Sequence, residues 1–346
     1  MNRWRIAGWV LAVAVAAATI MGLADRIGLG KIGWVFDLLS HFPKHLFVLA
    51  MIAAIVAGIG RTWRGGLLAL GVAGVNALLV LTLGGYALPQ AAPPNSTPIR
   101  VVSANLHGSA AALSDLIKLS AKYDADLIAL YEAPEDMTLE DAARLFPEMR
   151  TVKIASQTPE GRKLIRRSVL MAKSPNADGV TLTTFPESYG VIMRTHLPVA
   201  GSTVRIATVH PPSPVDPDAM GDRNQELLQV GEGIPDAAPF IILGDFNATP
   251  WGRSYGFVPG IRAGDPRFDG SFPALAGPVG LPIDHIKFGG GLVLTEYHVG
   301  PDIGSDHRPL FATFALPEPL VPPAPVNAAP PASLPSGVDP AVPPRD

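Results

Sequence analysis

The chain has 346 residues, of which 48% are apolar and only 16% are charged. An average soluble protein carries roughly 25% charged residues, so this composition excludes a disordered or polyelectrolyte chain and indicates that part of the protein is not in water. The formal net charge of −3 excludes a global basic field for nucleic acid, and the absence of cysteine excludes disulfides, cysteine-ligated metals and a thiol nucleophile.

Three uncharged runs near the N-terminus account for the apolar excess. We expect transmembrane helices at about residues 4–24, 44–61 and 65–88, because roughly 20 apolar residues span a bilayer. A cleaved signal peptide is an alternative for the first run, although no small-residue cleavage site closes it. A buried core helix is an alternative for the second run, which has only 16 uncharged residues.

Arginines mark one side of these helices. Arg3 and Arg5 precede the first helix, and Arg61 and Arg64 fill the turn between the second and the third. The loop at residues 25–44 is mixed in sign. The positive-inside rule therefore predicts a multi-pass protein of the inner (cell) membrane, with the N-terminus in the cytoplasm and everything beyond the third helix outside it.

Proline-rich segments flank a single large domain. Residues 89–98 (PQAAPPNSTP) predict an extended linker, and residues 317–346, with eleven prolines in thirty residues, predict a disordered tail. The residues between them, 99–316, are enough to bury a sizeable core. This domain has 19 basic and 25 acidic residues, so its own net charge is −6.

Short β-type runs alternate with helical patterns along the domain. Strands are expected at residues 99–104, 126–131, 168–172, 189–196, 203–210, 239–244, 283–288 and 310–314. Helices are expected at 110–123, capped by Ser109 or Ser114, and at 218–230. This mixture predicts a layered α/β fold rather than a helical bundle or an all-β sandwich.

Hydrogen-bonding residues stand at the ends of six predicted strands. They are Asn105, Glu132, His210, Asp245 with Asn247, Asp284 with His285, and Asp306 with His307. Each alone is usually a turn residue, but six together predict one pocket. The carboxylates of Glu132 and Asp306 and the amide oxygen of Asn105 are hard ligands suited to Mg²⁺ or Mn²⁺ rather than zinc. The remaining Asp–His and Asp–Asn pairs can move protons and stabilise an oxyanion.

These residues resemble the signature of a known superfamily. Asn105, Glu132, His210, GDFN at 244–247, IDHI at 283–286 and SDHRP at 305–309 match, in order, the endonuclease/exonuclease/phosphatase superfamily. That group includes DNase I-like nucleases, abasic-site endonucleases, inositol polyphosphate 5-phosphatases and neutral sphingomyelinases. The resemblance covers residues 99–316 and implies a four-layer α/β sandwich, in which two packed mixed β-sheets are flanked by helices.

The resemblance also implies a metal site and a water-activating group. Glu132 is similar to the principal metal ligand, with Asn105 and Asp306 near the same ion. Asp245 is similar to the residue that positions or deprotonates the attacking water. Asn247 resembles the amide that donates to the phosphate oxygens.

Three further matches concern the scissile phosphate and its leaving group. His307 is similar to the histidine that contacts the phosphate, and Asp284 to the carboxylate that fixes its ring. His210 is similar to the acid of the DNase I-like branch. Two departures weaken an assignment to the abasic-site branch: Tyr131 stands where the family usually has glutamine, and His107 stands where those nucleases carry an acid.

Together these features predict a membrane-anchored, Mg²⁺- or Mn²⁺-dependent hydrolase of phosphodiester bonds, with a nuclease-like phosphodiesterase preferred. The negative domain charge argues against tight non-specific binding of duplex DNA. The basic run at 162–167, which includes Arg166 and Arg167, is a candidate substrate contact or else a solvated loop.

Other activities stay open at this point. A lipid head-group phosphodiesterase or an inositol-phosphate-type phosphatase is the first alternative, and a non-catalytic binding module on the same fold is the second. A phosphoester substrate and the lipid bilayer are the partners expected, and no protein partner is inferred.

Overall fold

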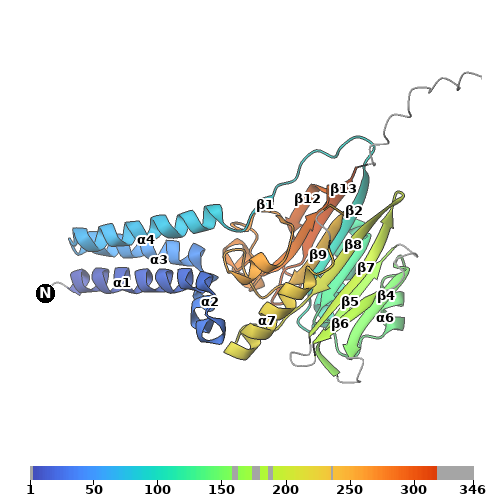
Figure 1. The fold of residues 1–346 in the computed structure, drawn as a ribbon, viewed down its shortest axis with the longest axis horizontal. Helices are drawn as coiled ribbons and strands as arrows, with labels where there is room; N and C mark the ends of the chain where they lie inside the picture. Colours follow the sequence, from blue (N-terminus) through green and yellow to red (C-terminus); the bar gives the residue numbers. More distant parts are fainter. Residues whose placement is uncertain (1–2, 158–162, 174–179, 186–189, 235–236, 318–346) are drawn as a thin grey trace, which may run out of the picture.

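Three long helices project side by side from one end of a two-sheet sandwich (Figure 1). The computed structural model describes residues 3–157, 163–173, 180–185, 190–234 and 237–317. The long helices are α1 (Arg3–Ala24), α3 (Pro43–Ile59) and α4 (Trp63–Thr82). Short helical segments join α1 to α3 at the end nearest the sandwich: η1 (Asp25–Ile27), η2 (Gly30–Gly33) and α2 (Trp34–Ser40). The predicted tail after residue 317 lies outside the described residues.

Small residues form the interior of the long-helix bundle, and large apolar residues cover its outside. Ala12, Ala50 and Ala53 are completely buried, and a Cβ added to Gly8 would lie 2.8 Å from the Cα of Ala57. The outward faces carry side chains that are at least 60% exposed: Val10, Ile20, Ile55, Leu67, Leu78 and Leu81. This arrangement is the reverse of that of a water-soluble bundle.

Length and composition make two helical segments able to cross a membrane, Arg3–Ile27 and Trp63–Thr82. The pair Gly30–Ser40 and Pro43–Ile59, bent by 61°, would be a third if it counts as one span. The third predicted run is helical only to Thr82, and not to residue 88. The backbone of Leu83 is already extended, Gly84 follows with a φ of +68°, and β1 (Tyr86–Ala87) then pairs in parallel with a strand of the sandwich.

The sandwich consists of two mixed β-sheets. The seven-stranded sheet has the order β1-β10-β11-β9-β8-β7-β6, and the six-stranded sheet has the order β12-β13-β2-β3-β5-β4. Their further strands are β2 (Thr97–Asn105), β3 (Leu127–Tyr131), β4 (Thr151–Gln157), β5 (Lys163–Ala172), β6 (Thr181–Phe185), β7 (Gly190–Val199), β8 (Ser202–Val209), β9 (Phe240–Asp245), β10 (Ile261–Ala263), β11 (Asp284–Gly289), β12 (Val293–Val299) and β13 (Leu310–Leu316). The α/β prediction is confirmed, and each of the eight expected strands is present.

The strands that the sequence did not reveal are short or lie toward sheet edges. β1 and β10 have two and three residues. β4, β6 and β12 are edge strands of the two described sheets, and their sequences mix polar with apolar residues. Such strands carry little of the apolar periodicity on which a sequence-based assignment depends.

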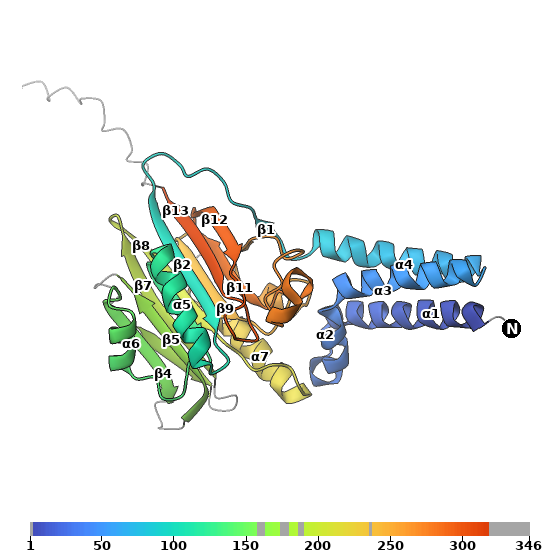
Figure 2. The same cartoon turned by 180° about the vertical axis from the view of Figure 1, so that it is seen from behind.

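Helices cover the outer faces of both sheets. α5 (Ala110–Tyr123) and α6 (Leu139–Leu145) lie on the six-stranded sheet (Figure 2), and α7 (Pro217–Val230) lies on the seven-stranded sheet (Figure 1). The Ser109 side chain caps α5 by accepting from the Ala112 N–H, as expected. Two shorter segments, η3 (Ser254–Phe257) and η4 (Ala274–Val279), lie on the side that faces the long helices.

The main core lies between the sheets. It includes Ile99, Leu127, Met193, Ile241 and Phe314, all nearly or completely buried. Because both sheets contribute to one apolar layer, their strand ends are held rigidly relative to each other. The polar groups at those ends therefore have fixed positions.

The core position of Phe314 leads to a stability prediction. Its side chain is completely buried and its ring centroid lies 4.8 Å from that of Phe288. Phe314→Ala should lower the free energy of unfolding by about 3–5 kcal/mol, because it leaves a cavity between the sheets. Leu139→Ala, at a side chain that is 55% exposed, is the control and should change it by less than about 0.5 kcal/mol. Denaturant titration of the full chain in detergent would measure both, and equal effects would contradict this core assignment.

Candidate active site

Strand pairing gathers the predicted polar residues at one edge of the sandwich. β2 and β3 run parallel with Asn105 opposite Tyr131. Glu132 directly follows Tyr131, so Asn105 and Glu132 lie side by side at the ends of two neighbouring strands. β9 and β11 run antiparallel with Asp245 opposite Asp284. The loop before β13 adds the last two predicted residues. The structure thus brings these predicted residues together at one edge of the sandwich.

A buried carboxylate–imidazole–carboxylate chain forms the inner part of the site. His307 Nδ1 lies 2.8 Å from Asp284 Oδ2, and His307 Nε2 lies 3.7 Å from Asp245 Oδ2. All three residues are almost fully buried. The two ring nitrogens of His307 thus face two different carboxylates.

These contacts set the charge state of His307. Burial alone lowers its pKa, but the carboxylates of Asp284, Asp245 and Asp306 outweigh burial and raise the pKa to about 10. The ring is therefore a cation at neutral pH. Its Nε2–H is available to a group that enters the site.

The pKa of the Asp245 carboxyl group is raised above its ordinary value. Burial raises its pKa, the neighbouring charge of Asp284 raises it further, and His307 offsets only part of this, so that the pKa is about 7. A carboxyl group with such a pKa can exchange a proton near neutral pH.

A second group of carboxylates lies beside this chain and is more open to solvent. The side chains of Glu132 and Asp306 are 31% and 37% exposed. His107 lies between them, with Nδ1 3.4 Å from Glu132 Oε2 and 3.5 Å from Asp306 Oδ1. His210 Nε2 lies 3.4 Å from Glu132 Oε1 and 3.6 Å from Asp245 Oδ2. His210 therefore links the open group to the buried chain.

The donor chemistry of the open group fits a divalent cation. Asp306 Oδ1 is buried and has no hydrogen-bond partner among the described residues. Together with Glu132 it provides two carboxylates around one position, which is the ligand type that Mg²⁺ and Mn²⁺ prefer. A second set of ligand atoms, from Asp245, Asp284 and His307, lies within 4.8 Å of one another and, like Glu132 and Asp306, already makes ion pairs.

Asn105 is arranged differently from the expected metal ligand. Its Nδ2 donates to Asp245 Oδ2 at 3.1 Å and to Glu132 Oε1 at 3.5 Å, while its Oδ1 accepts from the His107 N–H at 3.0 Å. The amide thus turns its N–H groups toward the carboxylates. Its expected role as an oxygen ligand stays a prediction.

Three residues at the site have left-handed backbones. His107, Glu132 and Asn247 each have a φ of +47°. Asparagine tolerates this region, whereas glutamate pays on the order of 1 kcal/mol for it. The conformation turns the chain sharply after β3 and after β9, and such backbones concentrate at functional sites.

Asn247 lies in the segment that follows β9, residues 246–251, which we name the β9 loop. Its N–H donates to Asp245 Oδ1 at 2.9 Å. Its side-chain amide donates to the Pro211 carbonyl at 3.1 Å and accepts from Ser213 Oγ at 2.7 Å. Asn247 is therefore next to the buried chain, and its amide bonds the segment after β8.

Among the basic residues of the 162–167 run, Arg167 is the one whose side chain belongs to the described part of the structure. Arg167 Nη1 donates to the carbonyls of Pro134 and Met137, at 3.0 and 2.9 Å, and so braces the loop after Glu132. The Arg166 side chain lies outside the described residues. Substrate binding by Arg166 and Arg167 stays a prediction.

The histidine at 285 has a structural position. Its Nε2 lies 2.8 Å from the Ala248 carbonyl and its Nδ1 accepts from Arg262 Nε at 3.1 Å, on a completely buried ring. Along β11 it faces away from Asp284, as the alternation of a strand requires.

Sequence reasoning missed two residues that shape the site. The ring of Phe272 lies 4.9 Å from that of His307. Ser305 Oγ donates to the Asn105 carbonyl at 2.8 Å and accepts from the His307 N–H at 3.1 Å. No local pattern marks Phe272, whereas Ser305 belongs to the SDHRP motif and could have been found there.

The sequence model of the endonuclease/exonuclease/phosphatase family matches residues 102–307, which is more than half of the chain. The chain belongs to this family. Members of the family are phosphoester hydrolases and typically depend on a divalent metal, so this chain is a phosphoesterase-type hydrolase. Comparison with curated protein sequences finds no match.

Solved structures share the fold. An endonuclease/exonuclease/phosphatase from Beutenbergia cavernae is 15% identical, with a TM-score of 0.51, over 63% of this chain and 72% of that chain. A family member from Bacteroides vulgatus is 16% identical, with a TM-score of 0.51, over 63% and 98%. Truncated TDP2 from Caenorhabditis elegans is 13% identical, with a TM-score of 0.50, over 63% and 97%. At these identities the likeness shows the fold alone.

The open carboxylates lead to a binding prediction. Glu132→Gln removes one negative charge and keeps the side-chain shape, so Mn²⁺ should bind at least about tenfold more weakly, or about 1.4 kcal/mol. Isothermal titration calorimetry of the full chain with Mn²⁺ would measure this without any substrate. Asp115→Asn, at an exposed carboxylate on α5, is the control and should bind as the wild type does. Unchanged affinity in Glu132→Gln would remove this residue from the metal site.

Proposed function

We propose that this protein is a membrane-anchored, divalent-metal-dependent phosphodiesterase, nuclease-like in its chemistry, with residues 99–316 as its catalytic domain. The observation that carries the proposal is the His307 imidazole, held between the buried carboxylates of Asp284 and Asp245 and next to the open pair of Glu132 and Asp306. This site combines a cation for phosphate, a proton acceptor and metal-binding oxygens.

The metal-binding part of the proposal comprises Glu132 and Asp306, with Asn105 beside them. A bound Mg²⁺ or Mn²⁺ supplies Lewis-acid stabilisation of negative charge on the phosphate and its leaving group. Glu132 and Asp306 hold the ion by their carboxylates. Asn105, through its N–H bonds, keeps the Glu132 and Asp245 carboxylates in place.

The buried chain performs the proton chemistry. Asp245 orients the attacking water and takes its proton, for which a pKa of about 7 is suited. His307 donates from Nε2 to a phosphate oxygen, and Asp284 fixes the ring through Nδ1. Asn247 gives an amide N–H to the phosphate after leaving the Pro211 carbonyl, and His210 protonates the leaving group.

The proposed location is the inner (cell) membrane, with the catalytic domain outside the cytoplasm and α1, α3 and α4 as three spans. The arginines at the start of α1 and in the α3–α4 turn lie at one end of the bundle, since a Cβ on Gly60 would lie 2.7 Å from the backbone of Trp4. That end is the one farther from the sandwich (Figure 1). The apolar outer faces of the helices support contact with lipid.

One observation favours a second candidate, hydrolysis of a lipid head group. In η4, Leu275 is 94% and Val279 is 66% exposed, and the Val279 carbonyl lies 3.1 Å from His45 Nε2 on α3. The chain that leads into η4 carries Phe272, whose ring contacts His307. A lipid surface at the ends of the helices nearest the sandwich would thus be near the site. An inositol-phosphate-type phosphatase shares the same chemistry, and a non-catalytic module is disfavoured because every hydrolytic position is filled.

The division of labour gives a kinetic prediction. With bis-p-nitrophenyl phosphate and Mn²⁺, His307→Ala should lose at least ~10²-fold in kcat, the usual order for a positioned proton-transfer group, and added metal should not restore it. Asp284→Asn should lose less, because an amide still contacts the ring. The double variant should be strongly non-additive, because the two residues act as one unit.

Controls separate this outcome from instability. His196→Ala, at an exposed strand histidine, should keep the wild-type rate and melting curve. A folded His307→Ala protein with the wild-type rate would refute the mechanism. A panel of DNA, RNA, sphingomyelin and inositol phosphates would then assign the substrate class.

Membrane topology gives a separate prediction. Alkaline phosphatase fused after Leu316 should be active in cells, and green fluorescent protein fused at the same point should be dark, because the fusion point lies outside the cytoplasm. The opposite pair of results would invert the proposed orientation and leave the enzymatic proposal untouched.

A further inference from the structure

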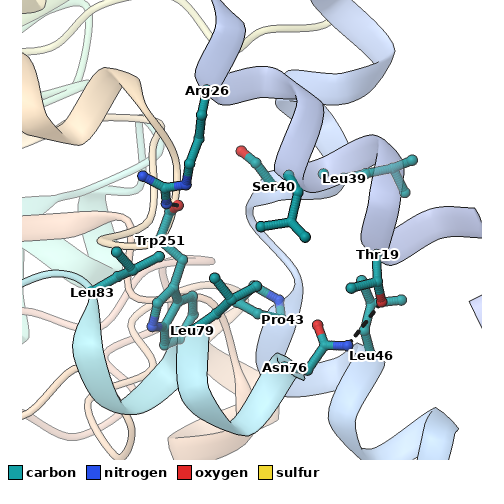
Figure 3. A pocket seen from close by; sticks show the side chains of 12 residues that line it. Thr19, Arg26, Leu39, Ser40, Pro43, Leu46, Asn76, Leu79, Leu83 and Trp251 are labelled. Carbon is teal, nitrogen blue, oxygen red and sulfur yellow. Dashed lines mark hydrogen bonds between the residues drawn. The ribbon is translucent and has the colours of Figure 1, made fainter. Parts of the chain in front are cut away.

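The β9 loop, which carries Asn247, enters the end of the helix bundle. Its last residue, Trp251, is 1% exposed and lies among Pro43 of α3, Leu79 of α4 and Leu83, which directly follows α4 (Figure 3). Arg26, just after α1, donates from Nη2 to the Trp251 carbonyl at 2.8 Å. Residues of α3, of α4 and of the segment after α1 therefore surround this one residue.

A second contact holds the middle of the β9 loop. The Thr249 N–H donates to His41 Nδ1 at 3.1 Å, and both residues are buried. The His41 ring lies so close to the chain that a Cβ added to Gly252 would be 2.3 Å from its Cε1. His41 directly follows α2, so the segment between α1 and α3 packs on the backbone of the loop.

A buried guanidinium makes the third contact. Arg223 of α7 donates from Nη2 to Asp37 Oδ1 of α2 at 2.6 Å and from Nη1 to the Asn247 carbonyl at 3.1 Å. Arg223 is completely buried and Asp37 is 2% exposed. Because an unpaired charge is costly in such surroundings, the Asp37 carboxylate fixes where the guanidinium lies.

Asn247 is thereby held from both sides. Its carbonyl accepts from Arg223, and its N–H donates to the carboxylate of Asp245. The left-handed backbone at Asn247 is held by these two bonds together with the side-chain bonds to Pro211 and Ser213. A displacement of Arg223 would move the Asn247 amide and rotate the Asp245 carboxylate together.

We propose that the membrane anchor completes the active site: Asp37, His41 and Arg223 are positioning residues that act on the phosphate-binding Asn247. This inference rests on the proposed function, because it assigns Asn247 to the reaction. The surface pair of Lys31 and Asp218 is an anchor–domain contact that does not involve the β9 loop. Both of its side chains are more than 60% exposed.

The test is a double-mutant cycle on the full chain in detergent. Arg223→Lys keeps the positive charge, but one ammonium group cannot reproduce the two-pronged contact with Asp37 and the Asn247 carbonyl. We expect kcat to fall about tenfold and KM to stay within about twofold, because misplacement affects the transition state more than binding. In an Asn247→Ala background the same change should cost less than about twofold. Lys31→Ala, which removes the surface pair, should keep the wild-type kcat.

A second measurement does not depend on activity. Amide hydrogen exchange at residues 246–252 should be faster in Arg223→Lys and in Asp37→Asn than in the wild type, while exchange in α5 should not change. The proposal would be overturned if the effects of Arg223→Lys and Asn247→Ala on kcat were additive and amide exchange at residues 246–252 were unchanged. If the wild type hydrolyses no phosphoester, the proposed function fails, but exchange still tests the positioning. If Arg223→Lys does not fold, Asp37→Asn and His41→Ala provide the same test.

Discussion

The antiparallel pairing of β9 with β11 is the constraint on which the site depends. It sets Asp245 opposite Asp284 at one edge of the sandwich. Two buried carboxylates so placed repel each other, and burial adds to that cost. His307 offsets both effects because its ring faces each carboxylate. A shift of the register by one residue would turn the two carboxylates to opposite faces and leave the imidazole with only one of them.

The site divides into a dry part and a wet part, and the division matches the tasks proposed for them. The chain of Asp284, His307 and Asp245 is buried, so its charge states are set by its own members rather than by solvent. Glu132 and Asp306 stay partly exposed, so an ion and a substrate can reach them. Placing the Glu132 carboxylate at this boundary requires a left-handed backbone, which is energetically unfavourable for glutamate.

Local patterns revealed what is local in this molecule. The eight central strands and α5 were predictable because long apolar runs and a serine cap mark them, and the polar residues at their ends formed recognisable motifs. The early end of α4 and the strand β1 were not, because pairing with β10 determines them. The helix α2 and the roles of Phe272 and Arg223 were likewise not predictable from the sequence. Each owes its position to residues that are distant in sequence, and no periodicity in their own segments records that contact.

The packing of Trp251 against the ends of the long helices has a consequence for folding during synthesis. A chain is synthesised from its N-terminus, so α1, α3 and α4 are complete before residue 251 is added. In the proposed topology, the bundle is already inserted when the domain emerges on the far side of the membrane, and it serves as a template against which the β9 loop settles. A copy of the domain that remained in the cytoplasm would fold without this template. If the proposed topology holds, maturation of the hydrolase would be coupled to its export, which would keep phosphoester cleavage away from the nucleic acids and metabolites of the cell interior.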